Sequence, residues 1–252
     1  MSGSAQLTIA LYSEDRRAAE RDFDALREVV LGMLDLLLGE PMTASIACEP
    51  AQPARKERVC GSYWKMSTGA SGPDREKRTL LVGAIATALR RHKLVIFHID
   101  ADATWADRER AEYHRHLERF TRDIRQLSGL GQQLDHYFIP AVPFYEFESW
   151  AYANRPALLD LLTDDADLAA VEAWLDDLTK LDEIPDIKDK LSIEGRHSHD
   201  LVNRRRGFPA AELAAAGKSY AATLDRLRRS SAVLALSLQP PKSSMPPTSV
   251  PA

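Results

Sequence analysis

One nearly unbroken apolar run, Lys93 to Ile99 (KLVIFHI), constrains the fold of this chain more than any other feature. A strand that is apolar at successive positions, rather than at alternate ones, is typical of a sheet with helices on both faces. The segment before it, Arg75 to Arg91, carries apolar residues at helical spacing. The run therefore predicts a central strand of an α/β sheet.

The rest of the chain repeats this alternation of strand and helix. Strand patterns occupy Gln6–Tyr12, Thr43–Cys48 and His136–Val142, and helical patterns occupy Arg16–Leu38 and Trp105–Leu127. Strands that are separated by helices favour βαβ units. We expect an α/β fold with a mainly parallel sheet flanked by helices.

The C-terminal part changes character. A helix is expected to begin within Phe144–Asn154, and Ala210–Leu238 reads as one or two closing helices. The last segment, Gln239–Ala252, is rich in Pro and Ser and has almost no large apolar side chain, which predicts disorder. We expect one domain over residues 1–238, with a helical C-terminal portion, and a disordered tail over 239–252.

Charge is distributed unevenly along the chain. The segment from Asp160 to Asp189 holds eleven acidic residues and two lysines, a net charge of −9, so the total of −4 leaves +5 for the rest. A polyanionic substrate is thus compatible with the composition. There is no signal-peptide pattern, and no apolar run approaches the roughly 18 residues of a membrane span. Cys48 and Cys60 lack zinc-site spacing. We expect a cytoplasmic protein that does not contact a membrane.

Carboxylates follow two of the expected strands. Asp100-x-Asp102 comes directly after the central strand, and Glu14 follows the first strand. Ligands bind beyond the carboxyl ends of parallel strands, which lie about 5 Å apart. Carboxylates that share a site repel one another unless a cation compensates, and Mg²⁺ or Mn²⁺ prefers such oxygen ligands. The alternative is that the aspartates cap the following helix and that Glu14 is a first-turn glutamate favoured by the helix dipole.

Other polar residues are weaker candidates. Glu146 and Glu148 would diverge by about 200° on a helix, so at most one should face the site. The run Arg204, Arg205 and Arg206 has the chemistry to bind phosphates, but it is equally typical of a solvated turn. His197 and His199 fit a polar loop better than a metal site.

Together these residues resemble a known superfamily. A glutamate after the first strand of a βα unit, followed by an apolar strand ending in D-x-D, is similar to the Toprim fold of topoisomerases, primases and OLD-type nucleases. Phe147-Glu148-Ser149-Trp150 resembles the aromatic E-x-W segment of compact bacterial Toprim-like proteins of unknown function. The similarity extends from about Gln6 to Asn154, and the lysine-bearing segment Pro185-x-x-Lys188 shows a weaker resemblance.

The resemblance implies roles for these residues. Glu14 would be the general acid/base or a metal ligand, Asp100 and Asp102 would bind Mg²⁺ or Mn²⁺, Glu148 would be an added ligand, and Lys188 would contact phosphate together with Arg204 and Arg205. The implied activity is phosphodiester hydrolysis of nucleic acid, in phage defence or genome maintenance. The resemblance is also compatible with a protein partner such as an ATPase. One departure is Asp15, where Toprim proteins usually have glycine after the glutamate.

Two other functions fit parts of the sequence. Ile99 to Thr104 matches the hhhDxDxT motif of haloacid-dehalogenase-like phosphotransferases, in which Asp100 would be the nucleophile. That motif normally lies near the N-terminus of its domain, and only Asp164-Asp165 offers a second acidic pair here. The other alternative is a non-catalytic Toprim-like adaptor that binds a protein through its acidic segment, Asp160 to Asp189.

Overall fold

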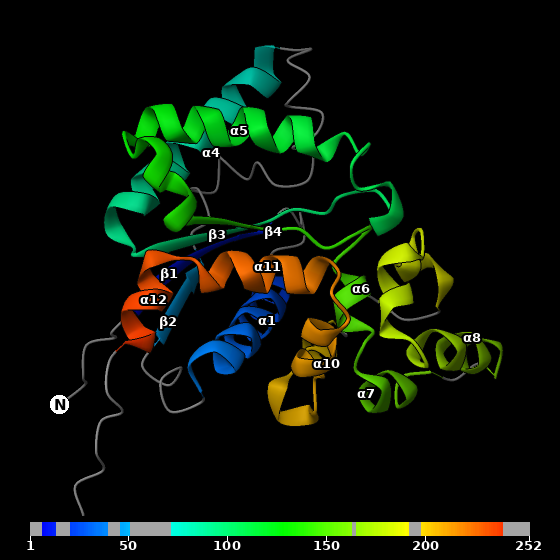
Figure 1. Ribbon diagram of the computed structural model, residues 1–252. Coiled ribbons are helices and arrows are strands. Elements are labelled where there is room, and N and C mark those ends of the chain that lie inside the picture. The colour runs from blue at the N-terminus through cyan, green and yellow to red at the C-terminus, as the bar shows by residue number, and fades with distance from the viewer. Residues whose placement is uncertain are drawn as a thin grey trace, which may run out of the picture.

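The computed structural model describes residues 7–13, 21–39, 46–50, 72–162, 165–191 and 198–238. Within these ranges, four strands form one sheet in the order β2-β1-β3-β4 (Figure 1). The strands are β1 (Leu7–Ser13), β2 (Ile46–Pro50), β3 (Leu94–His98) and β4 (Phe138–Ala141), and every neighbouring pair is parallel. The expected α/β fold with a parallel sheet is confirmed.

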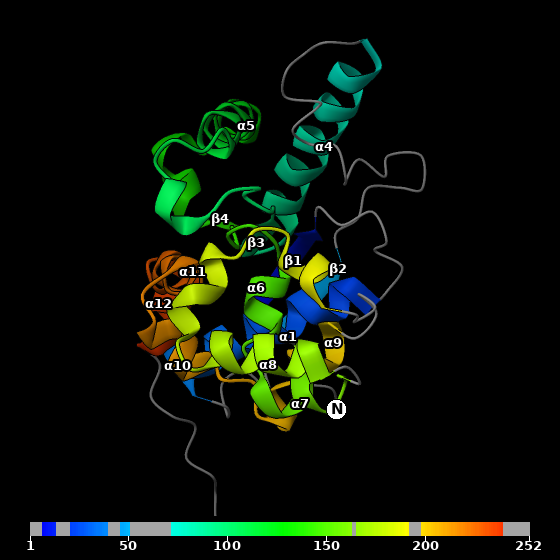
Figure 2. The same ribbon diagram turned by 90° about the vertical axis from the view of Figure 1, so that its right-hand side faces the viewer.

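Helices cover both faces of the sheet (Figures 1 and 2). α4 (Gly72–Arg91) and α5 (Tyr113–Ser128) lie on one face, and α1 (Arg21–Leu38) lies on the other with the C-terminal helices. Successive strand residues point to opposite faces, so Ile96 joins the α1-side core and Phe97 joins the α4–α5 core. All five residues of β3 are buried, as its continuous apolar run predicts.

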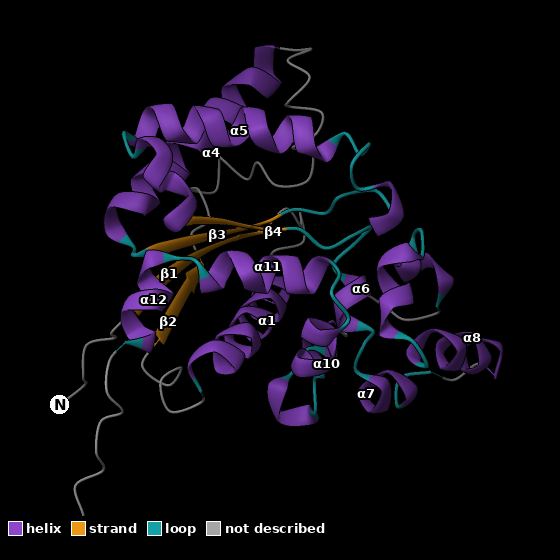
Figure 3. Ribbon diagram, viewed as in Figure 1, coloured by secondary structure: helices purple, strands orange, loops and turns teal. Residues whose placement is uncertain are grey.

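The C-terminal part is mostly helical (Figure 3). It contains α6 (Glu148–Ala151), α7 (Arg155–Leu159), α8 (Asp165–Leu175), α9 (Ser198–Leu201), α10 (Ala210–Ala215), α11 (Ser219–Arg228) and α12 (Ser231–Ser237). Short 3-10 segments are η2 (Trp105–Asp107), η3 (Gly131–His136), η4 (Leu178–Glu183), η5 (Ile187–Lys190) and η7 (Arg204–Arg206). None of the helices in the described part of the chain is long and apolar enough to cross a membrane.

Three helices, rather than the expected one or two, close the chain over residues 210–238. Gly217, with a φ of 71°, turns the chain between α10 and α11. Ser230 then caps α12, because its hydroxyl accepts the Val233 N–H at 3.3 Å. Local turn and cap chemistry therefore divides a segment that helical spacing alone presents as continuous.

The helix expected over Trp105–Leu127 is also divided, into η2 and α5. The Trp105 ring packs edge-on against Phe144, with ring centroids 4.8 Å apart. The Arg108 guanidinium lies 4.9 Å from the centroid of the Trp105 ring and donates to the Trp105 carbonyl at 3.0 Å. These contacts stabilise a turn before Tyr113, where α5 begins.

β4 is an edge strand, and Pro140 lies in its middle. The carbonyls of Tyr137 and Ala141 accept hydrogen bonds from the β3 side, so the carbonyl of Pro140 points to the open side. Arg226 of α11 donates to that carbonyl at 3.2 Å. Burial lowers the pKa of Arg226, and its guanidinium covers this part of the edge.

Candidate functional site

The carboxyl ends of β1 and β3 are neighbours. Ser13, the last residue of β1, is in register with His98, the last residue of β3, and His98 is in register with Ala141 of β4. Asp100 follows His98 by two residues. Glu14 follows Ser13 in the sequence but lies outside the described residues. The sheet thus brings the end of β1 next to the strand that leads into Asp100-x-Asp102.

The loops after β3 and β4 are hydrogen-bonded to each other. The Asp102 N–H donates to the Tyr145 carbonyl at 3.3 Å, and the Tyr145 N–H donates to the Ala103 carbonyl at 2.9 Å. Both Asp102 (φ 49°) and Tyr145 (φ 57°) adopt the left-handed backbone conformation, which residues other than Gly rarely adopt. Such strained residues persist where surrounding contacts hold them, often at functional sites. The D-x-D segment is therefore a turn that is held by hydrogen bonds to the loop after β4.

A buried imidazole connects β1 to the first aspartate. His98 is 3% exposed, with Nδ1 3.1 Å from Ser13 Oγ and Nε2 3.2 Å from Asp100 Oδ1. The His98 ring also packs edge-on against Phe147. Sequence reasoning counted His98 only as part of the apolar run. The available signal was its position two residues before Asp100, on the same face of the strand.

Further carboxylates lie near this edge. Glu146 is buried and precedes α6, whereas Glu148 is the first residue of α6, so the argument that the two diverge on one helix does not apply. Burial raises the pKa of Tyr152, and the charges of Glu148, Glu146 and Asp189 raise it further. Burial likewise raises the pKa of Tyr145, with added contributions from Asp186, Asp102 and Glu146. The surroundings of both tyrosines are strongly acidic.

The aspartates have the right donor chemistry for Mg²⁺ or Mn²⁺. Mg²⁺ usually keeps several waters and binds through one or two carboxylates, which Asp100 and Asp102 supply. Among the residues with described side chains, no group of three or more His, Cys, Asp or Glu could hold a metal ion. The predicted third ligand, Glu14, lies outside that part of the chain, as does His197, and the side chains of Lys188 and His199 are not described.

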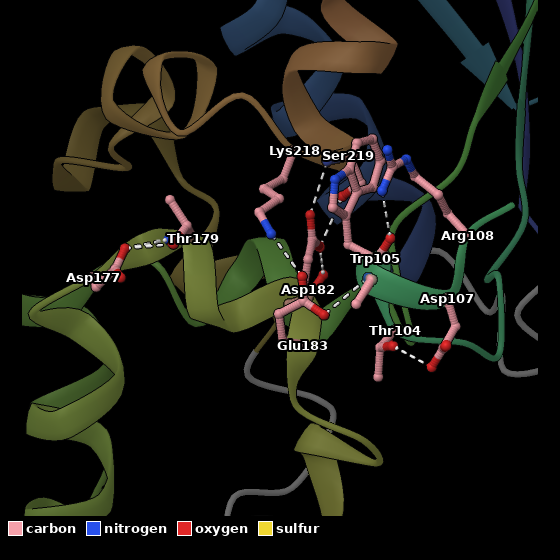
Figure 4. Close-up of polar contacts among 12 residues, drawn as sticks. Thr104, Trp105, Asp107, Arg108, Asp177, Thr179, Asp182, Glu183, Lys218 and Ser219 are labelled. Atoms are coloured by element: carbon pink, nitrogen blue, oxygen red, sulfur yellow. Dashed lines mark hydrogen bonds and ion pairs between the residues drawn. The ribbon is translucent and has the colours of Figure 1, made fainter.

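A second buried carboxylate organises the C-terminal layer (Figure 4). Asp182 is 4% exposed and accepts hydrogen bonds from Ser149 Oγ (3.0 Å), Ser219 Oγ (2.8 Å) and the Ser219 N–H (2.8 Å). Trp150 Nε1 donates to the same Ser219 Oγ at 2.6 Å. Burial raises the pKa of Asp182, although these hydrogen bonds oppose the shift. Asp182 thereby joins η4 to α6, which begins at Glu148, and to α11.

The neighbouring Glu183 holds the segment that follows D-x-D. Its Oε2 accepts the Ala106 N–H at 3.0 Å, and its Oε1 accepts from Lys218 Nζ at 2.6 Å (Figure 4). This carboxylate therefore links η2 to the N-terminus of α11. The two acids of η4 thus make internal contacts, whereas the adaptor alternative counts them within its acidic interaction surface.

The arginine run divides into two environments. Arg204 contacts two carboxylates of α1: its Nε donates to Glu28 at 3.2 Å, and its Nη1 donates to Asp35. The pKa of Arg204 is raised: burial alone would lower it, but its bonds to Asp35 and then Glu28 outweigh burial. The side chain of Arg205 is exposed. Arg204 thus ties η7 to α1, and Arg205 is the more accessible candidate for phosphate.

Comparison with known proteins adds no relative. No protein-family model matches the chain, and no curated protein or solved structure matches it. The fold and site define an α/β protein with a parallel sheet. At the carboxyl edge of this sheet, the surroundings are acidic and the loops after β3 and β4 are hydrogen-bonded to each other.

Proposed function

We propose that this protein is a Toprim-like phosphodiester hydrolase that uses Mg²⁺ or Mn²⁺ to cleave nucleic acid at the carboxyl edge of its sheet. The observation that supports the proposal most is the place of Asp100-x-Asp102. It follows the fully buried central strand, and its second aspartate has a positive φ in a loop that is hydrogen-bonded to the next loop. Ligand sites of parallel sheets occur at such strand ends.

Each candidate residue has a chemical task in this proposal. Asp100 and Asp102 would hold the cation, and Glu14 would move a proton or complete the ligand set. When bound, the cation would polarise a phosphate oxygen and stabilise the departing oxyanion. Glu148 is described but does not form a metal-holding group with Asp100 and Asp102, so the third ligand in this proposal is Glu14. Lys188 and Arg205 would contact the phosphates.

The biological setting belongs to the same proposal. A role in phage defence or genome maintenance and a protein partner such as an ATPase come from the Toprim resemblance, whereas a cytoplasmic location is expected because the sequence has no signal-peptide pattern and no apolar run long enough for a membrane span. The Toprim resemblance and the proposed metal site together favour nucleic acid as the substrate class. Assays with single-stranded DNA, double-stranded DNA and RNA would identify the substrate.

The test compares Asp100→Asn and Asp102→Asn with the wild type. Each variant should lose Mn²⁺-dependent cleavage and remain folded, because the amide keeps the shape and removes the charge that attracts the cation. Asp107→Asn is the matched control: Asp107 is exposed, lies five residues after Asp102 and undergoes the same charge change. Undiminished cleavage in both site variants would refute the proposal.

Metal binding separates catalysis from an adaptor role. Mn²⁺ at 100 times its dissociation constant should stabilise the wild type by about 2.7 kcal/mol, and an adaptor without a site should show no shift. Glu14→Gln then assigns the role of Glu14. Loss of turnover with Mn²⁺ binding retained would make it the acid/base, and loss of both would make it a ligand.

A further inference from the structure

His98 is the one polar residue of β3, whose other members are Leu94, Val95, Ile96 and Phe97. A buried imidazole destabilises a core unless its nitrogens find partners. Both nitrogens have one: Ser13 Oγ at 3.1 Å and Asp100 Oδ1 at 3.2 Å. We propose that His98, held by Ser13, is a positioning residue that orients the Asp100 carboxylate for metal binding. This inference rests on the proposed function.

The chemistry of the partners sets the direction of each hydrogen bond. An ionised carboxylate only accepts hydrogen bonds, so the proton must lie on Nε2, toward Asp100. In a neutral imidazole Nδ1 is then the acceptor, and the Ser13 hydroxyl donates to it. The Phe147 ring, 5.2 Å away and nearly perpendicular, packs against the imidazole as well. These three contacts fix the orientation of the ring.

A bond to Oδ1 fixes the orientation of the Asp100 side chain and keeps its negative charge. A carboxylate has two oxygens, so this bond is compatible with coordination of a cation. In metal sites, partners behind the ligands orient them, and their loss weakens metal affinity about 10- to 100-fold. Ser13 also directly precedes Glu14, so the same contact ties the end of β1 to the D-x-D segment.

The experiment measures Mn²⁺ affinity by calorimetric titration, together with the melting temperature of the metal-free protein. His98→Leu should weaken Mn²⁺ binding about 10- to 100-fold. His98→Gln should restore most of the affinity, because its amide nitrogen offers a donor near the position of Nε2. Ser13→Ala should give a smaller loss. His116→Leu is the control: His116 is a buried histidine of α5, so its replacement should shift the melting temperature and leave Mn²⁺ affinity unchanged.

The outcomes separate the two proposals. Wild-type binding that is unchanged in His98→Leu would overturn the inference alone. Absence of Mn²⁺ binding by the wild type would overturn the metal site and both proposals with it. If His98→Leu does not fold, the inference is tested by the Mn²⁺ affinity of Ser13→Ala and by nitrogen-15 NMR of the His98 imidazole. A proton on Nε2 is expected, and a ring that is protonated on Nδ1 alone would overturn the inference.

Discussion

Replacing Asp182 with alanine should destabilise the fold strongly, because the carboxylate is the shared acceptor of several buried donors. It accepts the hydroxyls of Ser149 and Ser219 and the backbone N–H of Ser219. The hydroxyls can rotate toward other acceptors, but the N–H is fixed by the start of α11. The alanine variant therefore leaves at least one buried backbone donor without its partner.

The magnitude follows from these donors. A buried donor left unsatisfied costs about 1–3 kcal/mol, and each lost hydroxyl bond costs about 1 kcal/mol. Relief of the burial of a charged group offsets part of this, so we expect a loss of about 3 kcal/mol. Ser149→Ala removes a single hydroxyl and should cost about 1 kcal/mol.

The loss should also depend on pH. Because burial raises the pKa of Asp182, the folded state binds its proton more tightly than the unfolded chain does. The stability contributed by this proton is fully present below the unfolded pKa, about 4, and is lost as pH rises through the higher folded pKa. The alanine variant lacks this contribution. Its deficit relative to the wild type should therefore be larger at pH 5 than at pH 8.

Urea denaturation followed by circular dichroism measures these differences, provided that the m-values agree. Asp182→Ala, Ser149→Ala and the wild type should be compared at pH 5 and pH 8. A loss below about 1 kcal/mol in Asp182→Ala, within the cost of one ordinary hydrogen bond, would refute the reasoning. A deficit that grows with pH would refute the assigned direction of the pKa shift.

Two further predictions concern residues away from the carboxyl edge. Cys48 is partly buried, and this burial raises the pKa of its thiol to about 12. In a Cys60→Ser background, the native protein should therefore react with a thiol reagent at pH 8 much more slowly than the denatured protein does, and equal rates would contradict this prediction. Arg204→Gln should lower the free energy of unfolding by about 2 kcal/mol in urea denaturation, because it removes a cation from two carboxylates of α1. Replacing the exposed Arg205 with Gln should leave the free energy of unfolding nearly unchanged. Equal effects of the two substitutions would contradict a structural role for Arg204.

The sequence predicted those features that depend on local pattern. The buried central strand followed from its continuous apolar run, and the long helices α1 and α4 followed from their apolar spacing. The division of the helix expected over Trp105–Leu127 did not follow, because it depends on Phe144, which is distant in sequence. Packing between such residues overrides local propensity.

The same distinction applies to the candidate site. Asp100-x-Asp102 is visible as a motif because its members are adjacent in sequence. The role of His98 depends on Ser13, 85 residues away, and that of Asp182 on Ser219, 37 residues away. A buried polar residue looks like any other polar residue until its partners are known. Sequence reasoning therefore found the carboxylates and missed the groups that position them.

The edge at β4 limits strand addition on this side of the sheet. An open edge strand offers unpaired N–H and carbonyl groups to which another strand can add. At the centre of β4, Pro140 has no N–H to offer, and its carbonyl already accepts from Arg226. A fifth strand, from a peptide or from a second copy, would lack both bonds there. Recruitment by strand addition is thus disfavoured on this side, and a partner that approaches β4 has to recognise helices and side chains.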